Sequence, residues 1–284
     1  MTTTATARFD DKLRDAQQRS GSLLCVGLDP EPTRFPDAIG KGPESIAAFN
    51  RAIIVATSDI ASCYKPNLGF YLRYGVIGIE ALAQVRRDVP EHIPVLLDAK
   101  FGDLDLTSSG YAEAVFDLWN FDAVTVNAFM GRDSLEPFLN RTGRGIFILA
   151  KTSNPGSGLF QDRTLVGNSE NDEETLTLAV TRHAVEWGRT SAASVGLVTG
   201  ATYPAQLAAI RAAAPDMTFL VPGVGAQAGD LESAVRAGLD ARNTGLIISA
   251  SRAICYASSG EDFQDAAHRA AEGLRDQINA ARAP

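Results

Sequence analysis

Short apolar runs recur eight times along the chain, separated by longer segments of helical periodicity, and this alternation limits the possible folds more than any other feature. The runs are continuous rather than alternately apolar and polar, which is typical of parallel strands covered on both faces. The segments between them carry apolar residues at i, i+3 and i+4, which predicts amphipathic helices. The runs span residues 23–28, 61–68, 93–99, 123–127, 145–151, 194–199, 218–222 and 245–249. Eight strand–helix units predict an α/β fold of the (β/α)8 barrel (TIM barrel) type.

The length of the chain suits one such barrel. It has 284 residues, a barrel of this class needs about 250, and no linker-like segment divides it. We therefore expect a single domain over residues 1–284, with residues 1–8 forming a loose tail. The alternative is an open, doubly wound sheet, whose first strand is usually followed by a Gly-rich fingerprint. Here the first run ends in Gly27-Leu28-Asp29-Pro30, which is not such a motif.

One segment departs from the strand–helix pattern. Residues 152–174 are too many and too polar for an ordinary connection between a strand and the next helix. Long loops in compact domains usually carry a function or are mobile, although a tolerated surface insertion is an equal alternative for the distal half.

The acidic composition argues against whole classes of partner. The formal net charge is −8 and the isoelectric point is about 5.0, so we expect neither nucleic acid nor an anionic membrane to bind across the surface. A small anionic ligand in one local cationic pocket stays possible. No apolar run approaches the roughly 20 residues that span a bilayer, and the first residues lack the apolar core of a signal peptide.

The cysteines and histidines predict neither a disulfide framework nor a metal site. Cys25, Cys63 and Cys255 are odd in number and far apart, which favours reduced, buried thiols in a cytoplasmic protein. The histidines are equally scattered and have no metal-ligand spacing. We therefore expect no metal and no Ser-His-Asp triad.

Charged and polar residues gather where the predicted strands end, the edge at which barrel enzymes place their chemistry. Lysine is depleted in strands and is seldom buried without a partner, so the lysines within these runs indicate function. The polar residues at strand ends are Asp29, Lys65, Asn67, Asp98, Lys100, Asn127, Lys151, Thr152, Ser153, Thr199, Ser251 and Arg252.

The stretch Asp98-Ala99-Lys100-Phe101-Gly102-Asp103 is the most informative. Asp98 and Lys100 are two apart on a strand, so they share a face at about 7 Å between Cα atoms. Gly102 permits a sharp turn before Asp103, and Lys65 at the neighbouring strand end can reach the same place. Ammonium groups between two carboxylates keep all four groups charged. This pattern predicts either a catalytic array or a structural network of ion pairs.

A second pattern predicts a phosphate site. Gly223 and Gly225 follow the seventh run and let the backbone approach a ligand closely, and Arg252 follows the eighth. A glycine pair alone usually marks a turn. The arginine one strand later favours phosphate binding.

The D-x-K-x-x-D pattern of residues 98–103 resembles the signature of the orotidine 5′-phosphate decarboxylase suprafamily. Five further segments resemble the same family in the same order, and the resemblance runs from about residue 20 to 275. They look like the bacterial group with a longer loop after the fifth strand, type 2. These segments are CVGLDP (25–30), YKPNLGFY (64–71), KTSNPGS (151–157), VPGVGAQ (221–227) and SRAICYA (251–257).

The resemblance implies a role for each site residue. It implies that Lys100 gives a proton to the pyrimidine carbon that loses carbon dioxide, with Asp98 beside the departing carboxylate. Lys65 would complete a charged tetrad together with Asp103, which would reach across from the second subunit of a homodimer. The remaining positions would bind the substrate. Asp29 and the partner subunit's Thr107 would contact the ribose, and Ser153 would bond the pyrimidine ring. Gln227 and Arg252 would hold the phosphate.

The implied activity is decarboxylation of orotidine 5′-phosphate to uridine 5′-phosphate without a cofactor, the last step of UMP biosynthesis. Two enzyme classes remain as alternatives: a Schiff-base aldolase, which wants a lysine in an apolar setting, and a metal-dependent sugar-phosphate decarboxylase with the same D-x-K-x-x-D pattern. A barrel kept only for binding is the third alternative. Borohydride trapping and sensitivity to a chelator distinguish the two enzymes from the implied one.

Overall fold

The predicted barrel is present in the computed structural model, which describes residues 8–166, 173–224 and 231–283. Within these residues eight parallel strands form one sheet. All eight predicted runs contain a strand. The strands are β1 (Leu24–Leu28), β2 (Cys63–Pro66), β3 (Leu96–Phe101), β4 (Ala123–Val126), β5 (Gly145–Lys151), β8 (Ser194–Thr199), β9 (Phe219–Pro222) and β10 (Leu246–Ala250).

The sheet closes on itself in chain order. The hydrogen-bonded order is β2-β1-β10-β9-β8-β5-β4-β3, and two isolated parallel bridges, Tyr64 with Val95 and Asn67 with Asp98, join the two remaining edges. Because neighbouring strands in the barrel are parallel, every carboxyl end lies at the same rim. An open, doubly wound sheet is thereby excluded.

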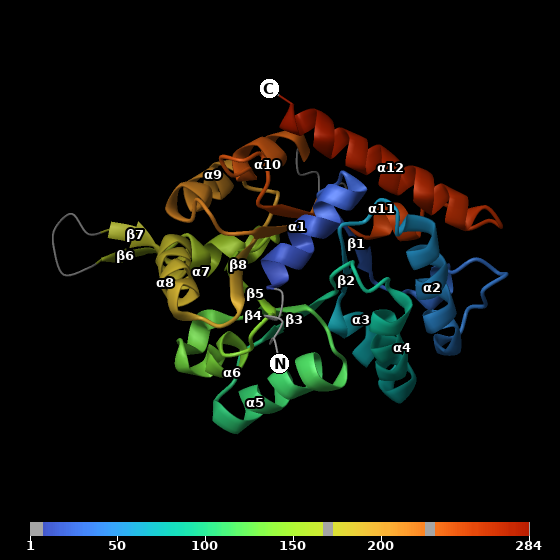
Figure 1. Cartoon of the computed structure of the whole chain (residues 1–284), viewed down its shortest axis with the longest axis horizontal. Coiled ribbons are helices and arrows are strands. Elements are labelled where there is room, and N and C mark those ends of the chain that lie inside the picture. Colours follow the sequence, from blue (N-terminus) through green and yellow to red (C-terminus); the bar gives the residue numbers. More distant parts are fainter. Residues whose placement is uncertain (1–7, 167–172, 225–230, 284) are drawn as a thin grey trace, which may run out of the picture.

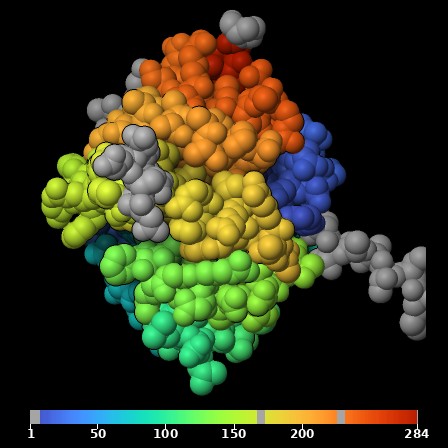
Figure 2. All heavy atoms as spheres, turned by 90° about the vertical axis from the view of Figure 1, so that its left-hand side faces the viewer, coloured from blue at the N-terminus to red at the C-terminus, as the bar shows by residue number. Residues whose placement is uncertain are grey.

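Helices surround the barrel, and the one on which the chain ends is the longest of those described (Figure 1). Figure 2 shows that on one flank the outer layer follows chain order, from green α5 and α6 through yellow α8 to orange α9 and α10. The α-helices are α1 (Phe9–Ser20), α2 (Ile46–Thr57), α3 (Leu68–Leu72), α4 (Gly75–Asp88), α5 (Asp105–Glu113), α6 (Glu136–Leu139), α7 (Gly158–Gln161), α8 (Leu176–Thr190), α9 (Pro204–Ala213), α10 (Leu231–Gly238), α11 (Arg252–Cys255) and α12 (Phe263–Arg282).

The barrel interior is filled by side chains from every strand, and α1 plugs its amino end. Phe9 and Leu13 of α1 join this interior cluster, and the Phe9 ring packs edge-on against Phe147 with centroids 5.7 Å apart. A Cβ at Gly145 would lie 2.7 Å from the Phe9 ring, so glycine makes room for the plug. The predicted tail lies outside the described residues except for Arg8, which directly precedes α1.

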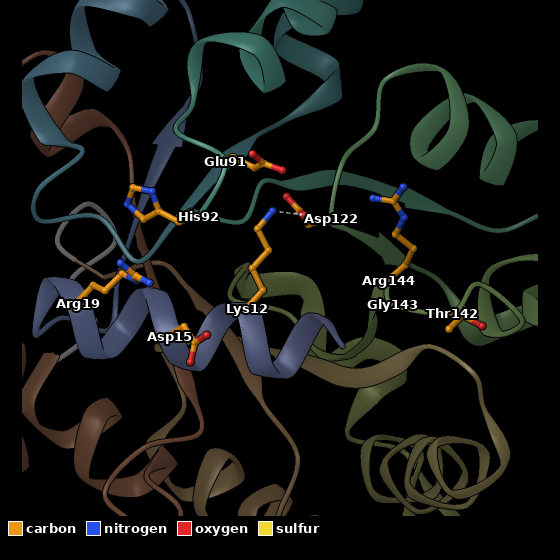
Figure 3. A pocket seen from close by; sticks show the side chains of 9 residues that line it. All are labelled: Lys12, Asp15, Arg19, Glu91, His92, Asp122, Thr142, Gly143 and Arg144. Atoms are coloured by element: carbon orange, nitrogen blue, oxygen red, sulfur yellow. Dashed lines mark hydrogen bonds and ion pairs between the residues drawn. The ribbon is translucent and has the colours of Figure 1, made fainter. Parts of the chain in front are cut away.

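A polar pocket of about 760 Å³ lies beside α1 at the amino ends of the strands (Figure 3). Lys12 pairs there with Asp122 at 2.5 Å, and Arg86 holds the second oxygen of Asp122 at 2.9 Å. The pocket is at the opposite end of the barrel from the predicted chemistry. In barrels this end contributes stability rather than catalysis.

Residues 152–174, the segment that departs from the strand–helix pattern, include elements that the sequence pattern did not predict. They contain α7 and a short antiparallel pair, β6 (Thr164–Val166) with β7 (Glu173–Thr175). This hairpin projects away from the barrel (Figure 1), and residues 167–172 are outside the described residues.

The described residues also test the expectations about the cysteines and about membrane-spanning segments. Cys25, Cys63 and Cys255 are free and buried, as predicted. None of the described helices combines the length and apolarity needed to cross a bilayer.

Candidate active site

The carboxyl-end rim brings together most of the predicted site residues. Lys65 lies within β2, and Asp98 and Lys100 lie within β3. Asp29, Ser153, Gly223 and Arg252 directly follow β1, β5, β9 and β10 or lie within two residues of them. These residues therefore share one end of the barrel, as the strand-end pattern predicted.

Asp98 lies at the centre of a charged cluster that also contains Lys65, Lys100, Asn67 and Thr125. Its carboxylate accepts a hydrogen bond from each of these four side chains. Its Oδ1 accepts from Lys100 Nζ at 2.5 Å and from Thr125 Oγ1 at 3.0 Å. Its Oδ2 accepts from Asn67 Nδ2 at 3.0 Å and from Lys65 Nζ at 3.3 Å. These four donors fix the carboxylate in one orientation and satisfy both oxygens.

The two lysines determine the charge state of the cluster. Burial alone would raise the pKa of Asp98, but Lys65 and Lys100 outweigh it and hold that pKa well below its usual range. Burial alone would lower the pKa of Lys65, but the carboxylates of Asp98 and Asp29 outweigh it and raise that pKa. Asp98 and Lys65 therefore stay ionised at neutral pH, as the sequence predicted.

Lys100 is the lysine that faces solvent at the barrel mouth. Its side chain is 45% exposed, whereas that of Lys65 is 7% exposed and that of Asp98 is 13%. A buried lysine behind the carboxylate cannot reach a ligand as readily as one at the mouth. The exposure favours Lys100 as the group that meets the substrate.

The contact between Asp98 and Lys100 depends on an irregular backbone, which the alternation of side chains along a regular strand did not predict. The pairing of β3 with β4 shifts register between Leu97 and Phe101, and Lys100 has a left-handed φ of 55°. Non-glycine residues seldom adopt this region except under a structural constraint. The bulge thus turns the Lys100 side chain back onto Asp98.

Asp103 and Thr107 do not join the cluster within their own chain. The only described partner of the Asp103 carboxylate is the amide of Leu104, 2.8 Å away. Thr107 is exposed on the first turns of α5. The resemblance placed both residues in the site of a partner subunit, and that placement stays a prediction.

Asp29 has an oxygen free for a ligand. Its Oδ1 is buried without a hydrogen-bond partner, as is the hydroxyl of Ser251. The backbone around it is held by Tyr256, whose hydroxyl donates to the Asp29 carbonyl at 3.0 Å and accepts from the Glu31 amide at 2.6 Å. A buried, unsatisfied carboxylate oxygen is costly, which suits a position that a ligand hydroxyl completes.

Ser153 and Gly223 lie side by side. A Cβ at Gly223 would be 3.2 Å from the Ser153 Cβ, and Gly223 has a φ of 97°, so a larger residue would be both crowded and strained. Thr202 also donates to the Ser153 carbonyl at 3.2 Å. The structure thus joins the predicted ring-binding residue to the first glycine of the predicted phosphate loop.

The segment after β5 is anchored through partly buried polar contacts. Lys151 Nζ pairs with Asp162 at 2.7 Å and lies over the Tyr203 ring. The Gln161 amide accepts from the Thr152 backbone and donates to its hydroxyl, at 3.0 and 2.9 Å. Lys151 is therefore a buried anchor of this segment, whereas Lys100, which pairs with Asp98, is exposed at the mouth.

Arg252 begins α11, and its exposed side chain has no described hydrogen bond or ion pair. This leaves the guanidinium available to an anion. Gly225 and Gln227, the other predicted phosphate residues, lie outside the described residues.

The described residues contain no group of three or more His, Cys, Asp or Glu side chains placed to hold a metal ion. Asp98 is engaged by two ammonium groups, an amide and a hydroxyl, which is an unfavourable setting for a cation.

Two members of the cluster were missed as site residues. Asn67 was recognised only as polar at a strand end, and Thr125 only as part of a strand. Both contact Asp98 directly. A single hydroxyl within the apolar run Ala-Val-Thr-Val was the available signal for Thr125.

A family model described as the orotidine 5′-phosphate decarboxylase / HUMPS family matches residues 22–267. The chain belongs to this family. A relative from Thermomicrobium roseum named orotidine 5′-phosphate decarboxylase is 48% identical over 274 residues, 96% of each chain. One of the same name from Roseiflexus castenholzii is 49% identical over 276 residues, 96% of this chain and 98% of the relative.

A solved structure supports the same family membership. The structure of Leishmania donovani OMP decarboxylase is 38% identical, covers 97% of this chain and 98% of its own, and superposes with a TM-score of 0.82. The likeness thus extends over nearly the whole length of both chains.

Proposed function

We propose that the protein converts orotidine 5′-phosphate to uridine 5′-phosphate and carbon dioxide without a cofactor, as the last step of UMP biosynthesis. The observation that carries this proposal is Asp98 held between Lys65 and Lys100 at the barrel mouth. The names of the relatives favour the same activity. No feature of the described site favours the sugar-phosphate or aldolase alternative.

The chemistry follows from the charges. Breaking the bond between the ring and its carboxylate releases carbon dioxide and leaves an electron pair on the ring carbon. The Lys100 ammonium stabilises that developing charge and then gives it a proton. The fixed Asp98 carboxylate lies beside the substrate carboxylate and favours loss of its charge. Lys65 keeps Asp98 ionised.

The remaining predicted residues bind the nucleotide. The free oxygen of Asp29 would accept from ribose hydroxyls, and Ser153 would bond the pyrimidine ring. Gly223, Gly225, Gln227 and Arg252 would surround the phosphate. Binding energy from the phosphate, distant from the reacting carbon, is then available to lower the barrier.

The active unit is proposed to be a homodimer with shared sites, in which the partner subunit's Asp103 and the partner subunit's Thr107 complete each site. Apolar side chains beside the mouth are exposed in the single chain, as expected of a surface that a second copy covers. They are Leu104 and Leu106 near the start of α5, and Phe129 and Met130 after β4.

The whole chain is proposed to act as one barrel domain in the cytoplasm. The three free, buried thiols support a reducing compartment. Membership of the subgroup with the longer loop stays a prediction from the sequence.

Decarboxylation is expected to survive removal of divalent metal. Because Asp98 is already engaged by two lysines, the reaction needs no cation there. The measurement is the fall in absorbance as orotidine 5′-phosphate is converted, with and without EDTA. Activity lost to EDTA and restored by Mg²⁺ would support the sugar-phosphate class, and borohydride trapping of a carbonyl substrate would support the aldolase.

Arg252→Ala is expected to weaken binding of uridine 5′-phosphate by roughly 1.5–3 kcal/mol, the range of hydrogen bonds to charged groups. Binding of uridine, which lacks the phosphate, should hardly change. Calorimetric titration of both ligands is the measurement. Equal weakening for both would mean that Arg252 supports the structure rather than the phosphate.

A further inference from the structure

Thr125 is a buried residue of β4 whose hydroxyl contacts the Asp98 carboxylate from inside the barrel. It is 1% exposed, and Ala123, two residues earlier on the same strand, belongs to the barrel-interior cluster. Because strand side chains alternate, Thr125 also faces the barrel interior. Its hydroxyl therefore lies beneath Asp98, away from the mouth at which Lys100 is exposed.

One hydroxyl makes three contacts. Thr125 Oγ1 donates to Asp98 Oδ1 at 3.0 Å and accepts from the amides of Ala99 and Lys100 at 3.0 and 2.9 Å. A hydroxyl has one proton and two lone pairs, so these contacts use its full capacity. It therefore joins the carboxylate and the backbone of the two following residues in one rigid unit.

These amides need the hydroxyl because of the bulge in β3. Leu97 pairs with Val124 and Phe101 with Val126, so three residues of β3 face Thr125 alone. The Ala99 and Lys100 amides bond to the threonine side chain instead of to a strand carbonyl. Regular bonding resumes where the Asn127 amide donates to the Phe101 carbonyl at 2.7 Å. The left-handed φ of Lys100 lies within this bulge.

We propose that Thr125 is a positioning residue that holds Asp98 and Lys100 in the arrangement needed for the reaction. Its hydroxyl fixes the rotamer of Asp98 and the backbone from which Lys100 turns back toward that carboxylate. It acts through these residues, since it is buried below the mouth. This inference rests on the proposed decarboxylation.

The test compares Thr125→Val with Thr125→Ser. Valine keeps the branched shape and removes the hydroxyl, so kcat for orotidine 5′-phosphate should fall about 10–100-fold, the scale of a small misplacement of reacting groups. KM and the Kd of uridine 5′-phosphate should stay within about threefold, because ribose and phosphate contacts are made elsewhere. Serine restores the hydroxyl and should return kcat to within about threefold of wild type.

The matched control is Thr181→Val. Thr181 is fully buried on α8, and its hydroxyl donates to the Thr177 carbonyl at 2.8 Å. This variant loses a buried threonine hydroxyl whose described bond lies within α8 and does not touch Asp98 or Lys100, so its kcat should equal that of wild type. Circular dichroism measures folding of each variant, and Thr125→Ala replaces the valine variant if that one does not fold.

The outcomes separate the two claims. If wild type converts orotidine 5′-phosphate but Thr125→Val keeps its kcat, the positioning role is wrong and the proposed function stands. If KM and Kd rise together while kcat is unchanged, Thr125 acts in binding and the positioning role is again wrong. If wild type does not convert the substrate, the proposed function fails, and this inference fails with it.

Discussion

Lys100→Ala should lower the rate of orotidine 5′-phosphate decarboxylation by at least about 10⁴-fold while leaving the protein folded. The side chain supplies both the proton, a contribution of about 10²–10⁴, and a fixed positive charge at the developing carbanion, about 10²–10³. Its exposure at the barrel mouth means that truncation leaves no cavity in the core. The measurement is the change in absorbance on conversion to uridine 5′-phosphate.

Lys12→Ala is the matched control for Lys100→Ala. Lys12 makes an ion pair with Asp122 at the same distance, 2.5 Å, but at the opposite end of the barrel. Activity per folded molecule should equal that of wild type in this variant. Near-normal turnover in Lys100→Ala, or an equal loss in both variants, would contradict the role of Lys100.

Two inactive variants, Lys100→Ala and Asp103→Ala, should recover about a quarter of wild-type activity when they are unfolded and refolded together. Random pairing makes about half of the dimers mixed. One site of each mixed dimer inherits both defects, and the other combines an intact Lys100 with an intact Asp103 from the partner. The side chain of Asp103, which bonds only its neighbouring amide among the described residues, is free for this role.

Lys100→Ala mixed with Asp98→Ala is the control for this complementation. Both residues serve the site of one chain, since their side chains are in contact, so this mixture should stay inactive. Mass spectrometry must show subunit exchange in both mixtures. Persistent inactivity of the Lys100/Asp103 mixture despite exchange would mean that Asp103 acts within its own chain.

The fold was predictable because barrel strands are buried on both faces and therefore appear as continuous apolar runs. The short hairpin of β6 and β7 was not, because its strands are exposed or only half-buried and have no apolar pattern. The plug formed by α1 was missed as well. Its contact with Phe147 depends on two segments more than 100 residues apart in the sequence.

The site was predictable as far as strand-end position and residue type determine it. Lys65, Asp98 and Lys100 meet because parallel strands end at one rim. The bulge at Lys100 and its support by Thr125 were not predictable. A register shift between two strands depends on which side chains meet across them, and local spacing does not report that.

The most direct test of the central claim is to follow the wild-type protein with orotidine 5′-phosphate in D₂O containing EDTA. Cofactor-free decarboxylation with protonation by an exchangeable lysine predicts carbon dioxide and uridine 5′-phosphate in equal amounts. It also predicts one deuterium on the ring carbon that carried the carboxylate, detected by mass spectrometry and NMR. Absence of carbon dioxide, or product without deuterium at that carbon, would contradict the account.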